Sequence, residues 1–245
     1  MCYTMNMVKT LKGGSFNLEF GRNEDVVLGE VQRLLNKHDL DFLAVQEASD
    51  YRHVLRKGLN GYKYYTWFDG GRGADENGVV VRDGIAVDKF KGAFLGDGWT
   101  TIARDHHVAS VQNHVRIDGW LYVRGLHLPT PTHWVNGKLE APAERKDDFI
   151  ASVTALKRYL RWPGVVNARI AVGDWNESPT TTGEYSPNWL LTKTGAKAYT
   201  PTSSAGHGHI DWVAAKGCTI PHIFKDLDIR EGSDHEPVVF VIKKN

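Results

Sequence analysis

The segment Ile170-Ala171-Val172-Gly173-Asp174-Trp175-Asn176 passes from apolar to polar at Gly173. Its apolar part has the short, hydrophobic character of a strand that is buried in a sheet. Asp174 and Asn176 follow at the end of that strand, and loops at strand ends are where rigid scaffolds place chemistry. Both residue types also favour turns, so this segment alone could merely reverse the chain. It predicts a buried strand whose end carries a carboxylate and an amide.

A second segment of the same kind lies near the carboxyl terminus. Gly232-Ser233-Asp234-His235-Glu236-Pro237 runs directly into the apolar strand Val238-Val239-Phe240-Val241-Ile242. An acid and an imidazole, Asp234 and His235, therefore stand side by side at the beginning of a buried strand, although they could also be a cap or a surface pair. Together with the first segment they supply the groups needed for metal-assisted attack on a phosphate.

Four other polar residues stand at or near the ends of predicted strands: Asn6, Glu47, His127 and Asp211. Each has an ordinary explanation when it is taken alone. Asn6 suits a turn, Glu47 suits a solvated strand end, and His127 in an apolar strand is more often a hydrogen-bonded core histidine than a catalyst. Asp211 has apolar neighbours and needs a partner if it is buried. The pattern as a whole predicts a polar site at the strand ends.

Length and composition are those of an ordinary globular protein. The chain has 245 residues, of which 41% are hydrophobic and 24% charged, and without repeats or linkers we expect a single domain, 1–245. No apolar run approaches the ~18 residues needed to cross a bilayer. Cys2 and Cys218 form no disulfide pattern, so a cytoplasmic location is the default. We also expect a monomer that binds no membrane.

The pattern of apolar residues predicts the fold class. Helices are expected at residues 25–38, 142–161 and 187–194. Residues 79–81 and 85–87, separated by Asp83-Gly84, are expected to form a hairpin. Because strands outnumber helices and hairpins mix with helical crossovers, we predict an α/β sandwich of two packed sheets with helices on the outside.

Five motifs, in this order, resemble the endonuclease/exonuclease/phosphatase superfamily, which includes DNase I-like and exonuclease III-like enzymes. They are Val45-Gln46-Glu47, Gly125-Leu126-His127-Leu128, Gly173-Asp174-Trp175-Asn176, His209-Ile210-Asp211-Trp212-Val213 and Ser233-Asp234-His235-Glu236-Pro237. With Met5-Asn6-Met7, the resemblance covers nearly the whole chain. It implies a four-layered α/β sandwich, in which two mixed β-sheets pack face to face, with the site at one edge.

The resemblance also implies a divalent metal, Mg²⁺ or Mn²⁺. Glu47 matches the main metal ligand of the superfamily, with Asn6 beside it, and Asp234 matches the second acid near the metal. Carboxylate and amide oxygens suit Mg²⁺, which keeps several waters and reaches the substrate phosphate.

Catalytic roles follow from the resemblance in the same way. Asp174 matches the acid that orients or deprotonates the attacking water, and Asn176 matches the donor that holds the phosphate or the nucleophile. His235 matches the imidazole that contacts the scissile phosphate. Asp211 matches the carboxylate that orients this imidazole and favours its charged form. His127 stands where DNase I-like members use histidine as a candidate acid.

Departures from the superfamily pattern bear on the substrate. Met5 precedes Asn6, where an aromatic residue is usual, and Ala48-Ser49 follows Glu47, where abasic-site endonucleases usually have Thr-Lys. The second departure argues against a dedicated abasic-site enzyme. Gly70-Gly71-Arg72-Gly73 lacks the Walker spacing, and we interpret it as a loop from which Arg72 could contact the substrate.

Three functions are compatible with these residues. The leading prediction is a nuclease that hydrolyses phosphodiester bonds of nucleic acid by in-line attack of water. The alternative is a phosphatase or phosphodiesterase for a small phosphate, such as an inositol phosphate, a lipid head group or a nucleotide. The net charge of +1 keeps this alternative open, because proteins that hold long duplexes by charge are usually far more basic. The third is a binding domain without catalysis.

Overall fold

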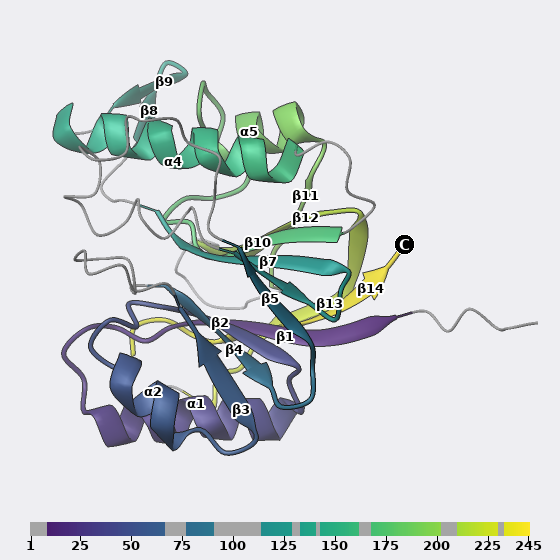
Figure 1. The fold of residues 1–245 in the computed structure, drawn as a ribbon. Coiled ribbons are helices and arrows are strands. Elements are labelled where there is room, and N and C mark those ends of the chain that lie inside the picture. The colour runs from purple at the N-terminus through teal and green to yellow at the C-terminus, as the bar shows by residue number, and fades with distance from the viewer. Residues whose placement is uncertain are drawn as a thin grey trace, which may run out of the picture.

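Two six-stranded sheets pack face to face between two layers of helices in the computed structural model of the protein (Figure 1). The structure describes residues 9–66, 77–90, 114–128, 133–140, 143–161, 168–201, 210–229 and 233–245. The first sheet has the order β13-β14-β1-β2-β4-β3, and the second has the order β11-β12-β10-β7-β6-β5. Each sheet contains parallel and antiparallel neighbours, so the predicted four-layered α/β sandwich of two mixed sheets is confirmed.

The strands of the first sheet are β1 (Thr10–Asn17), β2 (Phe42–Gln46), β3 (Tyr62–Tyr65), β4 (Gly78–Arg82), β13 (Cys218–Lys225) and β14 (Val238–Lys244). Those of the second are β5 (Val87–Phe90), β6 (His114–Ile117), β7 (Leu121–His127), β10 (Ala168–Asp174), β11 (Lys197–Tyr199) and β12 (Asp211–Lys216). A separate hairpin consists of β8 (His133–Val135) and β9 (Lys138–Glu140).

The helices are α1 (Glu24–His38), α2 (Arg52–Gly58), α4 (Ala143–Arg161) and α5 (Pro187–Thr194), and the three predicted helices are confirmed. The α1 helix begins where the Asn23 side chain accepts the backbone N–H groups of Asp25 and Val26. The α5 helix begins at the Ser186 cap and ends at Gly195, whose φ is +68°. None of the helices in the described ranges is both long enough and apolar enough to cross a bilayer.

Three apolar clusters hold the four layers together. The largest lies between the sheets and includes Phe42, Val123, Val172 and Phe240. A second lies between the second sheet and α4 with α5, and a third lies between the first sheet and α1 with α2. Side chains of the central strands are therefore buried on both faces, which explains why these strands are continuous apolar runs in the sequence.

The predicted hairpin of residues 79–81 and 85–87 is wrong. The β4 strand pairs with β2 and β3 in the first sheet, whereas β5 pairs with β6 in the second. The turn at Asp83-Gly84 thus carries the chain from one sheet to the other. Gly84 has a φ of +86°, as a turn requires, but the turn residues do not reveal which strand each apolar run joins.

Each sheet has one parallel pair at its centre, β1 with β2 in the first and β7 with β10 in the second. The carboxyl ends of these four strands meet at the same edge of the sandwich, since Asn17 at the end of β1 contacts Asp174 at the end of β10. Ends of parallel strands are where α/β sheets usually bind ligands. Glu47, His127 and Asp174, three of the predicted polar residues, lie at these strand ends.

Candidate active site

Three inward-facing side chains form a row across the second sheet at this edge. In the strand register His127 of β7 pairs with Asp174 of β10, and Asp174 pairs with Asp211 of β12. Directly paired residues project from the same face of a sheet, and this face is the one that carries Val172 and Val213 into the core between the sheets. His127, Asp174 and Asp211 therefore lie at the border of the apolar core between the sheets. Nε2 of His127 lies 3.6 Å from Oδ2 of Asp174.

Two tryptophans fix the strand ends that carry the acids. Trp175 and Trp212, the immediate neighbours of Asp174 and Asp211, stack with their ring centroids 3.8 Å apart. Nε1 of Trp175 donates to the carbonyl oxygen of Trp212 at 2.9 Å. Both rings are buried against the helix layer. The two carboxylates are therefore held in register by packing on the opposite face of the sheet.

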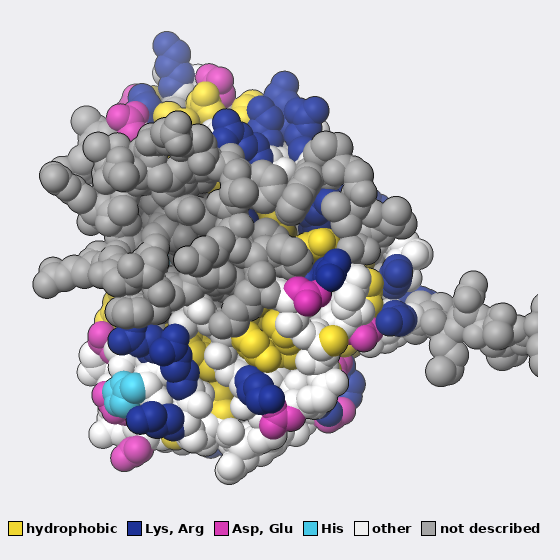
Figure 2. Space-filling view, in the orientation of Figure 1, with side chains coloured by type: hydrophobic (Ala, Val, Ile, Leu, Met, Phe, Trp, Pro, Cys, Tyr) yellow, Lys and Arg dark blue, Asp and Glu magenta, His cyan; other side chains and the backbone are white. Residues whose placement is uncertain are grey.

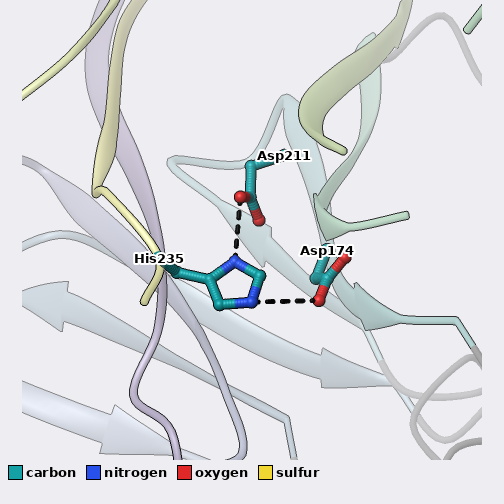
Figure 3. A group of neighbouring side chains, drawn as sticks. All are labelled: Asp174, Asp211 and His235. Carbon is teal, nitrogen blue, oxygen red and sulfur yellow. Dashed lines mark hydrogen bonds and ion pairs between the residues drawn. The ribbon is translucent and has the colours of Figure 1, made fainter. Parts of the chain in front are cut away.

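His235 lies between two carboxylates of the row (Figure 3). Its Nδ1 lies 3.0 Å from Oδ2 of Asp211, and its Nε2 lies 3.6 Å from Oδ2 of Asp174. Burial disfavours the charged imidazole, but the hydrogen bond with Asp211 and the negative charges of Asp211, Asp174 and Asp234 outweigh it and raise the pKa of His235 to about 9. At neutral pH His235 is therefore a cation with a hydrogen on each ring nitrogen, and its Nδ1 donates to Asp211.

Asp174 is buried and accepts hydrogen bonds on both carboxylate oxygens. Its Oδ1 accepts the backbone N–H of Asn176 at 2.8 Å, and its Oδ2 accepts Nδ2 of Asn17 at 3.4 Å. Burial and then the charge of Asp211 raise the pKa of Asp174 to about 6, whereas the neighbouring histidines and the Asn176 N–H oppose this rise. A carboxylate with such a pKa is suited to accept a proton near neutral pH.

Glu47 enters the site from the first sheet, directly after β2. Its φ is +53°, a left-handed backbone conformation that residues other than glycine adopt mainly at turns and functional sites. Nδ2 of Asn17 donates to Oε1 of Glu47 at 2.9 Å, and the backbone N–H of Phe20 donates to Oε2 at 3.1 Å. Oε1 also lies 3.9 Å from Nε2 of His127. Glu47 thus joins the two sheets at the site.

Asn17 stands beside Glu47, where the sequence predicts Asn6. Asn6 lies outside the described residues, whereas Asn17 is buried and contacts both Glu47 and Asp174. Phe16 precedes Asn17, and this is the aromatic–asparagine pair that is usual in the first motif. The pair, at the end of an apolar strand, is the signal in the sequence that identifies Asn17.

Asn176 and Asp234 lie at the border of the site. Nδ2 of Asn176 donates to the carbonyl oxygen of Leu128 at 2.7 Å, so one amide hydrogen holds the chain that follows β7. The side chain of Asp234 is 76% exposed, with Oδ1 3.7 Å from Nε2 of His235. Arg72 and His209, which were also named from the sequence, lie outside the described residues.

Among the residues that the structure describes, two groups of side chains could hold a divalent metal. Asp174, Asp211 and His235 offer ligand atoms within 4.8 Å of one another, and the same three side chains form an ion-paired network. Glu47 offers carboxylate oxygens, and Asn17 offers an amide oxygen that also accepts the backbone N–H of Glu19 at 3.0 Å; oxygens of these types are the ligands that Mg²⁺ prefers. The side chain of Glu47 is 16% exposed and thus open to an ion. The Glu47–Asn17 donor set fits Mg²⁺ or Mn²⁺.

The fold resembles those of several solved structures. The endonuclease/exonuclease/phosphatase from Bacteroides vulgatus aligns with a TM-score of 0.64 at 13% identity, over 97% of this chain and 100% of that one. D. rerio TDP2 complexed with single strand DNA product aligns with a TM-score of 0.59 at 14% identity, over 95% and 98%. The Bacteroides thetaiotaomicron mannosyl-6-phosphatase aligns with a TM-score of 0.59 at 15% identity, over 95% and 99%. At these identities the likeness shows a shared fold.

A comparison with curated protein sequences found no match. A family model does match, however, and residues 14–235 align with the one described as the Endonuclease/Exonuclease/phosphatase family. The matched range contains Asn17, Glu47, the row across the second sheet and His235. Members of this family are hydrolases that act on phosphoester bonds. The chain belongs to the endonuclease/exonuclease/phosphatase family.

Proposed function

We propose that the chain is a metal-dependent phosphodiesterase that hydrolyses nucleic acid by in-line attack of water. One observation carries this proposal: Asn17 and Glu47 from the first sheet meet Asp174, Asp211 and His235 at one edge of the sandwich. These groups supply a proton acceptor, a cationic donor and oxygen ligands for a metal, which are the parts that phosphodiester hydrolysis requires.

Asp174 and His235 would act on the attacking water and the phosphate, respectively. Asp174 orients the water and accepts its proton, for which a pKa of about 6 is suitable. His235 donates from Nε2 to a phosphate oxygen and stabilises the negative charge that develops there. Asp211 accepts the hydrogen of Nδ1 and so keeps His235 charged and oriented.

The remaining residues would bind the metal and the leaving group. Glu47 and Asn17 would hold a divalent metal, which would neutralise phosphate charge when bound. His127 lies beside both Glu47 and Asp174, where it can give a proton to the leaving oxygen. Asn176 keeps a second amide hydrogen for the phosphate, and the substrate contact of Arg72 stays a prediction.

A basic helix next to the site supports a polyanionic substrate. The α2 helix begins five residues after Glu47 and contains Arg52, Arg56 and Lys57 but no acidic residue. Figure 2 shows Lys and Arg side chains, with histidine among them, gathered over this helix at the lower left of the molecule. Positive side chains along one element are typical of surfaces that bind the phosphates of nucleic acid.

A phosphatase for a small substrate is the second candidate. It is supported by the fold shared with the mannosyl-6-phosphatase and by the net charge of only +1. The two candidates differ in what they need around the phosphate. A polymer requires contacts along several nucleotides and loses affinity steeply with salt, whereas a small phosphate requires a closed pocket and depends less on salt.

Hydrolysis of a substrate panel distinguishes them. Plasmid, single-stranded DNA, RNA, inositol phosphates and hexose phosphates are each incubated with Mg²⁺, Mn²⁺ or EDTA, with His235→Ala as the control variant. We expect metal-dependent cleavage of a polymer that is lost in EDTA and in His235→Ala. Phosphate release from the small molecules alone would refute the nuclease and establish the phosphatase.

A further inference from the structure

Phe20 exposes a large aromatic side chain beside a proposed metal ligand. It lies in the loop between β1 and α1, its residue is 43% exposed, and its backbone N–H donates to Oε2 of Glu47 at 3.1 Å. Exposed aromatic surface forgoes the stabilisation that burial would provide. The hydrogen bond places the backbone of Phe20 directly beside the carboxylate of Glu47.

The loop holds Phe20 in this exposed position from both sides. The hydroxyl of Tyr51, which is buried, donates to the carbonyl oxygen of Glu19 and accepts the backbone N–H of Arg22 at 2.9 Å. The guanidinium of Arg22 in turn lies 2.7 Å from the carboxylate of Glu30, and both side chains are nearly inaccessible to water. Moving this part of the backbone would break buried hydrogen bonds, whose loss is expensive. The loop therefore fixes the backbone of Phe20 beside Glu47.

We propose that Phe20 is a substrate-specificity residue whose ring stacks on the base of a nucleotide next to the scissile phosphate. This inference rests on the proposed nuclease function and adds to it a base-recognition element. Aromatic rings stack on bases of any sequence because every base has a flat π face. A phenyl ring has few rotatable bonds, so ordering it on a base loses little entropy. Sugar and inositol phosphates present no such face.

The test compares short strands that contain a single cleavable phosphodiester between uncleavable methylphosphonate linkages. One set carries bases on both sugars that flank this bond, and the other carries reduced abasic sugars there. Phe20→Ala keeps the backbone N–H, and hence the bond to Glu47, so it removes the ring alone. We expect Phe20→Ala to raise KM for the base-bearing strands by about 10-fold to 100-fold, with kcat and the KM for the abasic strands nearly unchanged. Phe20→Trp is expected to restore the low KM.

Phe224→Ala is the matched control. Phe224 is 40% exposed, and its ring packs against His38 at the end of α1, so its loss is expected to leave both KM values unchanged. Equal changes for the base-bearing and abasic strands, or no change in Phe20→Ala, would overturn the stacking role while leaving the nuclease standing. A wild-type protein that cleaves no strand but releases phosphate from small molecules would refute the proposed function, and the stacking role with it.

Discussion

His235 owes its charge at neutral pH to the carboxylates around it, and above all to Asp211. Asp211→Asn removes the hydrogen-bonded negative partner, so we expect the pKa of His235 to fall from about 9 toward its ordinary value of 6.5. A protonated imidazole exists below its pKa. A rate that requires this cation is therefore kept below about pH 9 in the wild type and lost as pH rises through that value. In Asp211→Asn the loss begins at lower pH.

Two measurements check this prediction. NMR titration of the metal-free protein gives the pKa of His235 directly, and the pH profile of kcat/KM gives its consequence for the reaction. Asp234→Asn is the control, because Asp234 is 76% exposed and its charge is screened by water, so a smaller shift is expected. An unchanged pKa of His235 in Asp211→Asn would contradict the role of Asp211.

At the scale of the element, β10 reaches the site only because residue 173 is glycine. Gly173 has a φ of +147°, and a Cβ there would overlap the carbonyl oxygen of Leu126 in the neighbouring strand β7. Gly173→Ala would therefore push apart the strand ends that carry Asp174 and His127. We expect a loss of at least about 2 kcal/mol in the free energy of unfolding, measured by denaturant titration.

Gly84→Ala separates the backbone strain of a positive φ from the steric clash of an added Cβ. Gly84 also has a positive φ, +86°, but a Cβ there would meet no atom within 4 Å. The backbone strain alone predicts a loss of about 1 kcal/mol. Similar losses in the two variants would show that the close approach of β10 and β7 has little energetic importance.

Elements differ in how well the sequence predicts them. The α1 and α5 helices are predictable because their caps and their apolar spacing act within a few residues. The pairing of β4 and β5 is not, since it depends on partner strands far along the chain. Val79 of β4, for example, pairs with Ala44 and Tyr65, and no local pattern near Asp83-Gly84 indicates that choice.

For the molecule as a whole, the sequence predicts the four layers and most of the site, because the polar strand ends are interpretable as motifs. It does not predict the contacts that assemble the site across the two sheets. The position of Asn17 beside Asp174 and that of Glu47 beside His127 depend on how β1 and β2 approach β7 and β10. One of these contacts joins residues 157 positions apart in the sequence, Asn17 and Asp174.

Phosphoester hydrolysis at this edge of the sandwich is expected to depend on Asp174. The most direct measurement is the rate of metal-dependent hydrolysis by Asp174→Asn, which keeps the shape of the side chain and removes the proton acceptor. Asp118→Asn, at an exposed acid paired with Lys9, is the control for loss of a carboxylate. We predict a fall of about 10²-fold to 10⁴-fold in kcat for Asp174→Asn and none for Asp118→Asn. A wild-type rate in a folded Asp174→Asn protein would contradict the account.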